Sequence, residues 1–366
     1  MNKKIRIGIT HGDVNGVGYE VILKSFTNAQ IFDLCTPILY GSPKVAAYQR
    51  KALDISTNFT IITRAEEAED RKLNVLNCVD DDLLVEFGKP DKKAGKSAFM
   101  ALEKAVEDYK AGLIDVIVTA PIDKNTIHSE EFEFPGHTEF FENRLGMGKK
   151  SLMILMKDDF RIALATVHIP LKEVPTSITK ELIQEKLDVL EEALRKDFNI
   201  AKPRIAVFSL NPHSGDSGLL GSEEQEIIIP ALKEKMEEGM LCYGPYAADG
   251  FMGSGNFTHF DGILAMYHDQ GLAPFKALAM GEGVNYTAGL PVVRTSPAHG
   301  TAYDIAGKGE AQEDSFRQAI YAAIDIFRNR SMNEKLLSES IYLGCDGQEK
   351  PKNKGVNGKY SNQDIA

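Results

Sequence analysis

Short apolar runs alternate with amphipathic stretches along most of the chain. The runs that we expect to form strands are "KIRIGIT" at 4–10, "PILY" at 37–40, "DVIVTA" at 115–120, "RIALATV" at 161–167, "RIAVFSL" at 204–210 and "GILAMY" at 262–267. Several are apolar nearly throughout, which is typical of strands buried on both faces of a sheet. Residues 97–112 and 180–196 repeat apolar side chains at helical spacing, so we expect a helix in each. This alternation predicts an α/β protein with a mainly parallel sheet.

Length and composition agree with a globular protein. The 366 residues fit about two domains of ordinary size, and 43% of them are hydrophobic and 26% charged. No apolar run is long enough to cross a bilayer, and the start "MNKKIRIGIT" lacks the apolar region of a signal peptide. We therefore expect a cytoplasmic location and no membrane partner. The polar, Gly-rich residues 346–366 predict a flexible tail.

Charge and cysteine usage narrow the possible partners and chemistry. A formal net charge of −11 argues against nucleic acid, because nucleic acid rewards basic surfaces. If the substrate is an anion, the cations that bind it must be local. Four cysteines are scattered without any C-x-x-C pair, which favours reduced structural thiols over a zinc ribbon or a disulfide framework.

Three of the expected strands are followed by a histidine. His168 follows "RIALATV", His213 lies in "NPH" after "RIAVFSL", and His268 follows "GILAMY". In open α/β sheets, ligands bind outside the carboxyl ends of the strands, so the three imidazoles should point toward one region. A catalytic divalent ion commonly takes three protein ligands and keeps one position open. Each histidine taken alone is more often a hydrogen-bonded loop residue, and the pattern leaves both interpretations open.

Candidate anion-binding residues follow His268. Lys276, Asn285 and Arg294 each lie in a loop or short strand bounded by Gly or Pro, and together they could hold a phosphate or carboxylate. His137 and Thr138 lie in a Pro-Gly turn that leads into a helix, where exposed helix amides also favour an anion. Singly, each of these residues is more often an ordinary surface residue.

A Gly-rich turn, "HGDVNGVGYE", follows the first strand and raises the question of nucleotide binding. It lacks the Lys and Ser/Thr of a P-loop, and its glycines do not have the G-x-G-x-x-G spacing of a Rossmann site. A tight strand-to-helix turn explains the glycines equally well, so a standard dinucleotide site is not predicted.

Seven motifs together resemble the 4-hydroxythreonine-4-phosphate dehydrogenase family of pyridoxal phosphate biosynthesis. They are "GDVNGVGYE", "PGHTEFF", "VHIPL", "LNPHSGDSG", "GPYAADGF", "YHDQGLAPFK" and "GLPVVRTSPAHGTAYDIAGKG", and they occur in the family's order between about residues 5 and 330. The first motif departs from the family at Val14, Asn15 and Tyr19, which leaves the choice among phosphorylated hydroxy acids open.

The resemblance implies a fold and a set of site residues. The expected fold has two α/β/α domains like those of isocitrate and isopropylmalate dehydrogenases, with the active site in the cleft between them. The first domain would comprise residues 1–135 and 280–345, and the second would comprise residues 136–279. The family implies a homodimer whose active site is shared across the interface. It implies metal ligands His168, His213 and His268, a substrate site of His137, Thr138, Lys276, Asn285 and Arg294, and an NAD site near His299, Gly300, Thr301 and Asp304.

The resemblance also implies a reaction. NAD would oxidise C3 of 4-phosphooxy-L-threonine to 2-amino-3-oxo-4-phosphooxybutanoate, a β-keto acid that decarboxylates to 3-amino-2-oxopropyl phosphate. The divalent metal would be zinc, with cobalt or magnesium as alternatives. Asp269 and Lys124 are candidates for general base, although either could be structural.

Three other functions stay open. A sister dehydrogenase for phosphorylated threonate or erythronate would keep every residue named above. A phosphate acyltransferase of related architecture would need no metal. A metal or nucleotide sensor would bind NAD without turning it over.

Overall fold

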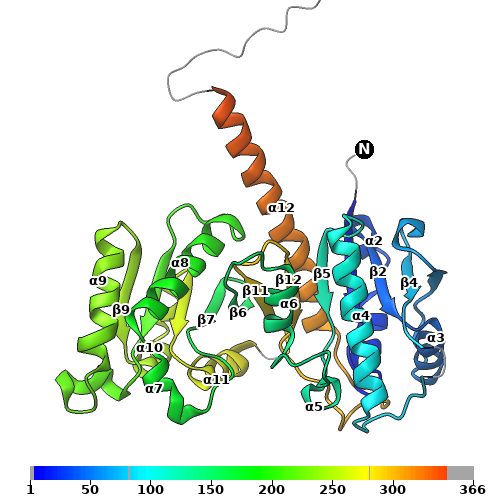
Figure 1. Ribbon diagram of the computed structural model, residues 1–366, viewed down its shortest axis with the longest axis horizontal. Helices are drawn as coiled ribbons and strands as arrows, with labels where there is room; N and C mark the ends of the chain where they lie inside the picture. Colours follow the sequence, from blue (N-terminus) through cyan, green and yellow to red (C-terminus); the bar gives the residue numbers. More distant parts are fainter. Residues whose placement is uncertain (1–3, 81–82, 280, 344–366) are drawn as a thin grey trace, which may run out of the picture.

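The computed structural model describes residues 4–80, 83–279 and 281–343, and it is built around one broad sheet (Figure 1). The strands of these residues lie side by side in the order β3 (Phe59–Ile62), β4 (Leu73–Asn77), β2 (Cys35–Gly41), β1 (Ile5–Thr10), β5 (Val116–Thr119), β12 (Arg294–Pro297), β11 (Val284–Ala288), β6 (Leu152–Lys157), β7 (Phe160–Leu164), β10 (Gly262–Ala265), β8 (Arg204–Phe208) and β9 (Leu241–Tyr246).

The sheet is parallel at both sides and antiparallel in its middle. The pairs β12–β11, β11–β6 and β6–β7 are antiparallel, and the other neighbouring pairs of the described strands are parallel. The parallel strands on one side come from residues before 120, together with β12, and those on the other side come from residues 160–265. The expectation of a mainly parallel sheet is confirmed, and the mixed middle is an addition to it.

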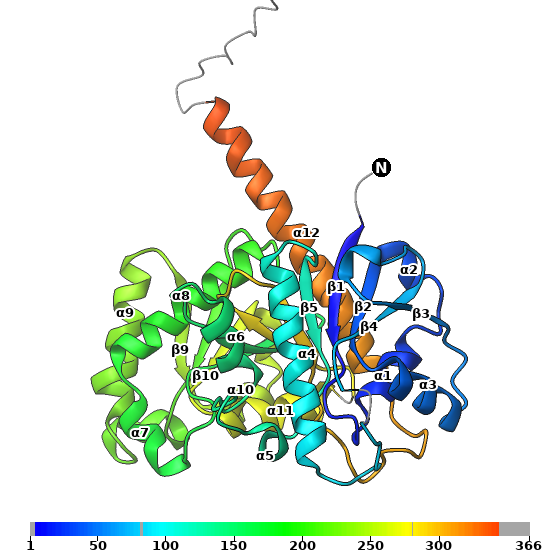
Figure 2. The same ribbon diagram turned by 45° about the vertical axis from the view of Figure 1, so that its right-hand side comes forward.

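Helices cover both faces of this sheet. Their bounds are α1 (Gly18–Ser25), α2 (Ile31–Leu34), α3 (Pro43–Ala52), α4 (Lys92–Lys110), α5 (Lys124–Ile127), α6 (His137–Leu145), α7 (Val174–Ser177), α8 (Lys180–Lys196), α9 (Ile229–Glu237), α10 (Ala248–Gly253), α11 (His268–Ala279) and α12 (Asp314–Leu343). On one side of the molecule α4 and α12 lie on opposite faces of β5 (Figure 2). The helix predicted over 180–196 is α8, and the helix predicted over 97–112 is the larger part of α4.

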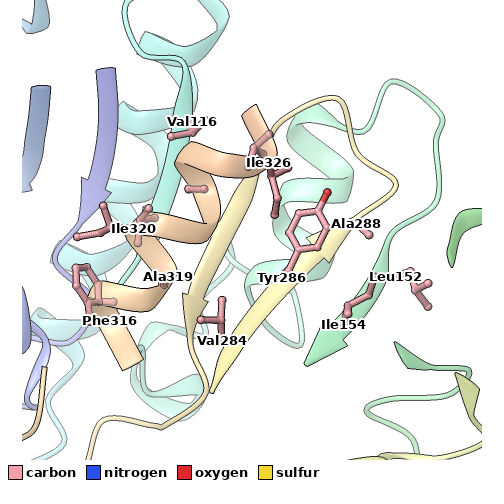
Figure 3. Packing of buried hydrophobic residues seen from close by; sticks show 14 of the residues in the cluster. Val116, Leu152, Ile154, Val284, Tyr286, Ala288, Phe316, Ala319, Ile320 and Ile326 are labelled. Atoms are coloured by element: carbon pink, nitrogen blue, oxygen red, sulfur yellow. The ribbon is translucent and has the colours of Figure 1, made fainter. Parts of the chain in front are cut away.

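The first half of α12 packs against the middle of the sheet. Its residues Phe316, Ala319, Ile320 and Ile326 are buried in one apolar cluster with alternate residues of two strands, which are Val284, Tyr286 and Ala288 of β11, next to the helix, and Leu152 and Ile154 of β6, beyond it (Figure 3). Successive side chains of a strand point to opposite faces, so the residues between these face away from α12. The opposite face of β6 and β11 is therefore not covered by α12.

The described residues do not test two of the expectations from the sequence. The division into domains at residues 135 and 280 stays a prediction, and the described strands on both sides belong to a single sheet. The expected tail at 346–366 lies outside the described residues. Among the helices of the described part, none is both long and apolar enough to cross a membrane.

Candidate active site

A cavity of about 220 Å³ lies against the antiparallel middle of the sheet. Its floor is formed by Met153 and Leu155 of β6, Asn285 of β11, and Arg294 and Ser296 of β12. The strand register places Asn285 beside both Leu155 and Ser296, one row away from the pairs of Thr287 with Met153 and Arg294. Residues two apart on a strand share a face, so this floor is the face that α12 leaves uncovered.

Most of the side chains predicted for the site line this cavity. They are Lys124, His137, Thr138, His168, His268, Asn285, Arg294, His299 and Gly300. Within the described residues, five buried polar atoms of the lining have no hydrogen-bond partner: His137 Nε2, Glu139 Oε2, Asn285 Oδ1, Arg294 Nε and His299 Nε2. A buried polar atom without a partner costs free energy, so their concentration at one cavity indicates a site for a polar ligand.

The other predicted residues lie outside the cavity lining. His213 and Asp269 line a second cavity, of about 410 Å³, which also borders α11. Thr301 directs its carbonyl oxygen to the amide of Val17 at 3.0 Å, and Asp304 is exposed.

The expectation that Lys276 lies in a loop or short strand is wrong. It lies on the exposed side of α11, which continues through Pro274. Gly271 and Phe275 are buried on the inner side of this helix. A Cβ on Gly271 would come within 2.5 Å of the side chain of Leu164 on β7, which shows how closely helix and sheet approach. Tertiary packing here overrides the local signals of Gly and Pro.

Arg294 is a buried cation without a carboxylate partner. Its side chain is 2% exposed and donates to the hydroxyls of Thr287 at 3.1 Å and Thr119 at 2.5 Å. Burial lowers the pKa of Arg294 to about 9, although the charge of Glu139 opposes this change, so the guanidinium is still protonated at neutral pH. No ion pair to Arg294 is formed within residues 4–80, 83–279 and 281–343. A buried charge of this kind is destabilising until an anion binds beside it.

His137 begins α6 and lies near the same charge. Its ring stacks on Phe141 with centroids 6.4 Å apart, and the ring of Phe141 also lies beneath the guanidinium of Arg294 at 5.8 Å. Burial, together with the charges of Arg294 and Lys124, holds the pKa of His137 well below its usual range. The ring is therefore neutral at pH 7 and can donate one hydrogen bond to an anion.

His168 is held between a lysine and a glutamate. Its Nε2 lies 3.1 Å from Nζ of Lys124, and its Nδ1 lies 3.3 Å from Oε1 of Glu139. Burial opposes ionisation of Glu139, but the hydrogen bond with His168 and the charge of Lys124 outweigh it and lower the pKa of Glu139. Glu139 is therefore a carboxylate within the cavity lining.

His268 has a similar arrangement in the first turn of α11. Its Nδ1 lies 2.7 Å from Oδ1 of Asp269, and its ring centroid is 6.1 Å from that of His168. The sequence left open whether Asp269 takes part in chemistry or orients its neighbour, and the contact favours an orienting role.

The spacing of these two imidazoles is close to what a shared divalent ion would require. One ion bound about 2.1 Å from a nitrogen of each ring would place the ring centroids roughly 5 to 6 Å apart. Each Nδ1 contacts a carboxylate, which leaves Nε2 for the ion. Within the described part of one chain, no group of three or more His, Cys, Asp or Glu side chains could hold a metal. Of the three histidines that the sequence predicts as ligands, His168 and His268 therefore lie close together within one chain, and His213 lines the other cavity.

His213 lies in an unusual backbone segment. Residues 213–217 all have left-handed backbone angles, including φ values of 53° at His213 and 42° at Asp216. The buried carboxylate of Glu224 accepts the amides of Leu210 and Asn211 at 2.8 Å each, and so fixes the entry to this segment. Left-handed non-glycine residues cost free energy and are concentrated at functional sites.

His299 and Gly300 connect the cavity to the Gly-rich turn after β1. Burial, together with the nearby charge of Lys276, lowers the pKa of His299. The next residues of the loop contact the turn, because Tyr303 donates to Asp13 at 2.8 Å and Val17 donates to the carbonyl of Thr301. The turn thus supports the loop, and its glycines allow close approach: a Cβ on Gly16 would come within 2.7 Å of the Thr301 oxygen.

Sequence reasoning did not identify Glu139 and Asp249 as site residues. Glu139 lines the first cavity and Asp249 lines the second, beside His213 and Asp269. Both occur within motifs quoted above, "PGHTEFF" and "GPYAADGF". Glu139 could have been suspected from its place in the first turn of α6, two residues after His137, which the sequence predicts as a substrate-binding residue.

Known proteins match this chain over most of its length. The family model described as "Pyridoxal phosphate biosynthetic protein PdxA" matches residues 33–323. A 4-hydroxythreonine-4-phosphate dehydrogenase of Bacteroides thetaiotaomicron is 73% identical over 89% of this chain and 90% of its own length. A D-threonate 4-phosphate dehydrogenase of Cupriavidus necator is 38% identical over 89% and 98%.

Solved structures have the same fold. The crystal structure of 4-hydroxythreonine-4-phosphate dehydrogenase from Klebsiella pneumoniae superposes with a TM-score of 0.76, at 31% identity over 89% of this chain and 98% of that chain. The family match and the identity over most of both chains agree with the large mixed sheet described above. The chain belongs to the PdxA family of pyridoxal phosphate biosynthetic proteins.

Proposed function

We propose that this chain is a 4-hydroxythreonine-4-phosphate dehydrogenase that acts in pyridoxal phosphate biosynthesis. It oxidises C3 of 4-phosphooxy-L-threonine with NAD, and the resulting β-keto acid loses CO2 to give 3-amino-2-oxopropyl phosphate. The observation that carries the proposal is the buried, unpaired Arg294 in the cavity that also contains His168 and His268. The activity named for the relative that is 73% identical supports it.

The substrate's phosphate would bind at the floor of the cavity. Arg294 offers a guanidinium whose charge no carboxylate of the described residues neutralises, and His137 offers a neutral ring whose Nε2 lacks a partner. Thr138 and Asn285 line the same space, and Lys276 adds positive charge near His299. Binding would offset the desolvation of Arg294, so phosphate recognition and substrate orientation are coupled.

His168 and His268 would hold the divalent ion, with His213 of a second copy of the chain as third ligand. When bound, the ion acts as a Lewis acid toward the C3 hydroxyl and stabilises negative charge on that oxygen. Zinc suits imidazole ligands best, and cobalt or magnesium are alternatives. A homodimer with the site at its interface follows from this ligand set, because one chain brings together only two of the three imidazoles.

Lys124, in its deprotonated amine form, is the first candidate for proton acceptor. Its Nζ lies within the cavity lining and contacts His168, so it lies beside the position of the reacting hydroxyl. Asp269 is directed to His268 and is better suited to orient that ring. NAD would bind along His299, Gly300, Thr301 and Asp304, where the loop borders the cavity and is supported by the Gly-rich turn.

A sister activity toward D-threonate 4-phosphate is the second candidate, because a relative with that name is 38% identical over nearly its whole length. The three departures from the family's first motif, at Val14, Asn15 and Tyr19, are buried and are not among the residues that line the cavity. They therefore give no direct support to a different substrate.

The test is NADH formation by the purified full-length protein with each phosphorylated acid, with and without a metal chelator. We expect 4-phosphooxy-L-threonine to be the best substrate and the chelator to abolish turnover. Absence of NADH formation with added metal would contradict the proposal. A preference for D-threonate 4-phosphate would establish the sister activity, and turnover that survives the chelator would contradict the metal assignment.

A further inference from the structure

We propose that Glu139 is a positioning residue that fixes the tautomer of His168 for metal binding. The inference rests on the proposed function, because it takes His168 as a metal ligand. It goes beyond that function in giving a role to a side chain that neither the sequence pattern nor the ligand set includes.

The proton on the ring of His168 can be placed from its two neighbours. An ammonium group only donates hydrogen bonds, so Nε2 of His168 accepts from Lys124 at 3.1 Å. When the ring carries one proton, that proton is then on Nδ1, which donates to Oε1 of Glu139 at 3.3 Å. In this tautomer, the lone pair that faces Lys124 is the one that a metal ion would use, with the lysine displaced.

The surroundings of Glu139 favour its contact with His168. It lies in the first turn of α6, its side chain is 34% exposed, and its second carboxylate oxygen is buried. The corresponding partner of His268, Asp269, is 85% exposed. Water can replace Asp269 more readily than Glu139. Loss of Glu139 should therefore disturb the ring of His168 more than loss of Asp269 disturbs the ring of His268.

A second role for Glu139 has to be separated from this one. Its negative charge lies near Lys124 and Arg294, so it could act only as a counter-charge. The two roles differ in the Glu139→Gln protein. An amide oxygen still accepts the hydrogen bond from Nδ1 but carries no charge, so a tautomer-fixing role survives this change and a counter-charge role does not.

The experiment measures Zn²⁺ affinity and the ring tautomer in the full-length protein. Affinity is measured by competition with a chromophoric chelator, and the tautomer is measured by ¹⁵N NMR of His168 in the metal-free protein. The variants are Glu139→Ala, Glu139→Gln and His168→Ala. Glu142→Gln is the matched control, because it lies one turn along α6 and bonds to Ser151 and Lys150, away from the cavity. Glu139→Leu replaces the Ala variant if that protein does not fold.

We expect Glu139→Ala to weaken Zn²⁺ binding about 10- to 100-fold and to produce a mixture of His168 tautomers. Glu139→Gln should stay within a few-fold of the unmodified protein, and Glu142→Gln should be unchanged. Unaltered affinity and tautomer in Glu139→Ala, or an equal loss in the Gln and Ala variants, would overturn the inference. Unaltered affinity in His168→Ala would overturn it together with the proposed metal site, so the two failures are distinguishable.

Discussion

The guanidinium of Arg294 donates a hydrogen bond to the hydroxyl of Thr287, its direct partner on the neighbouring strand, at 3.1 Å. With a second bond to Thr119, this contact holds the cation at the floor of the cavity without neutralising it. The proposed function assigns this charge to a ligand rather than to the fold, and this leads to the first prediction.

Arg294→Met should lower kcat/KM for the phosphorylated substrate on the order of a hundredfold or more, because a charge-assisted contact to phosphate is lost. The same change should raise the thermal stability of the ligand-free protein, because it removes a buried charge that lacks an anionic partner. Steady-state kinetics and thermal unfolding measure the two effects. Arg195→Met, at an exposed position of α8, is the control. A fall in both activity and stability would contradict this interpretation.

Mixing two inactive variants tests the shared metal site. His168→Ala and His213→Ala should each be inactive. If His213 acts across a dimer interface, a mixed dimer of these variants contains one intact site. Equal amounts, unfolded together and refolded, should then recover about a quarter of the unmodified activity, because half of the dimers are mixed and each has one working site. Ligands from a single chain would give no recovery.

Glu224 should determine the stability of the segment that carries His213. Removing its carboxylate leaves the partly buried amides of Leu210 and Asn211 without acceptors. We expect Glu224→Ala to lower the free energy of unfolding by about 3 kcal/mol, since each unpaired amide costs about 1 to 3 kcal/mol. Urea titration measures the loss. Glu226→Ala, at an exposed position two residues further on, should differ little from the unmodified protein.

His11 should make folding stability depend on pH. The ring is fully buried, stacks on Tyr19 with centroids 5.3 Å apart, and its burial lowers the pKa to about 4. The unfolded chain takes up this proton near pH 6.5, so the folded state loses stability as the pH falls from 6.5 toward 4. The contribution is about 3 kcal/mol over that range.

The His11→Phe protein should therefore show a shallower decline of unfolding free energy between pH 6.5 and 4, measured by urea titration at several pH values. His128→Gln, at an exposed position, should keep the slope of the unmodified protein. Equal slopes in all three proteins would show that His11 titrates normally in the folded state.

The parts of the fold that depend on local pattern could be predicted from the sequence. The periodicity of α8 predicts its bounds, and the apolar runs predict six of the strands, because burial of a periodic face is a local property. The antiparallel middle could not be predicted in this way. β11 and β12 are short, and the pairing of β11 with β6 joins segments more than a hundred residues apart, which no local pattern specifies.

The same distinction between local pattern and tertiary contact applies to the residues of the candidate site. His168 and His268 could be proposed because they follow apolar strand-like runs, and Arg294 because it lies in a segment bounded by Gly and Pro, although its burial was not predicted. The contact of Glu139 with His168 could not be predicted, because it joins α6 to the loop after β7 and no spacing in the sequence relates the two. Lys276 was placed in a loop because Gly and Pro flank it, and packing of α11 overrides that signal.

The alternation along β6 and β11 has a consequence for how this enzyme can change. Val284, Tyr286 and Ala288 pack in one cluster with α12 (Figure 3), while Asn285, between them, lines the cavity and Thr287 supports Arg294 at its floor. The face of these strands in the α12 cluster and the face that lines the cavity are therefore separated by a single layer of backbone. A substitution on the α12 side, such as Tyr286→Phe, should shift this backbone slightly and so alter the cavity side. Selection for thermal stability and selection for a new substrate should therefore act on the same few positions.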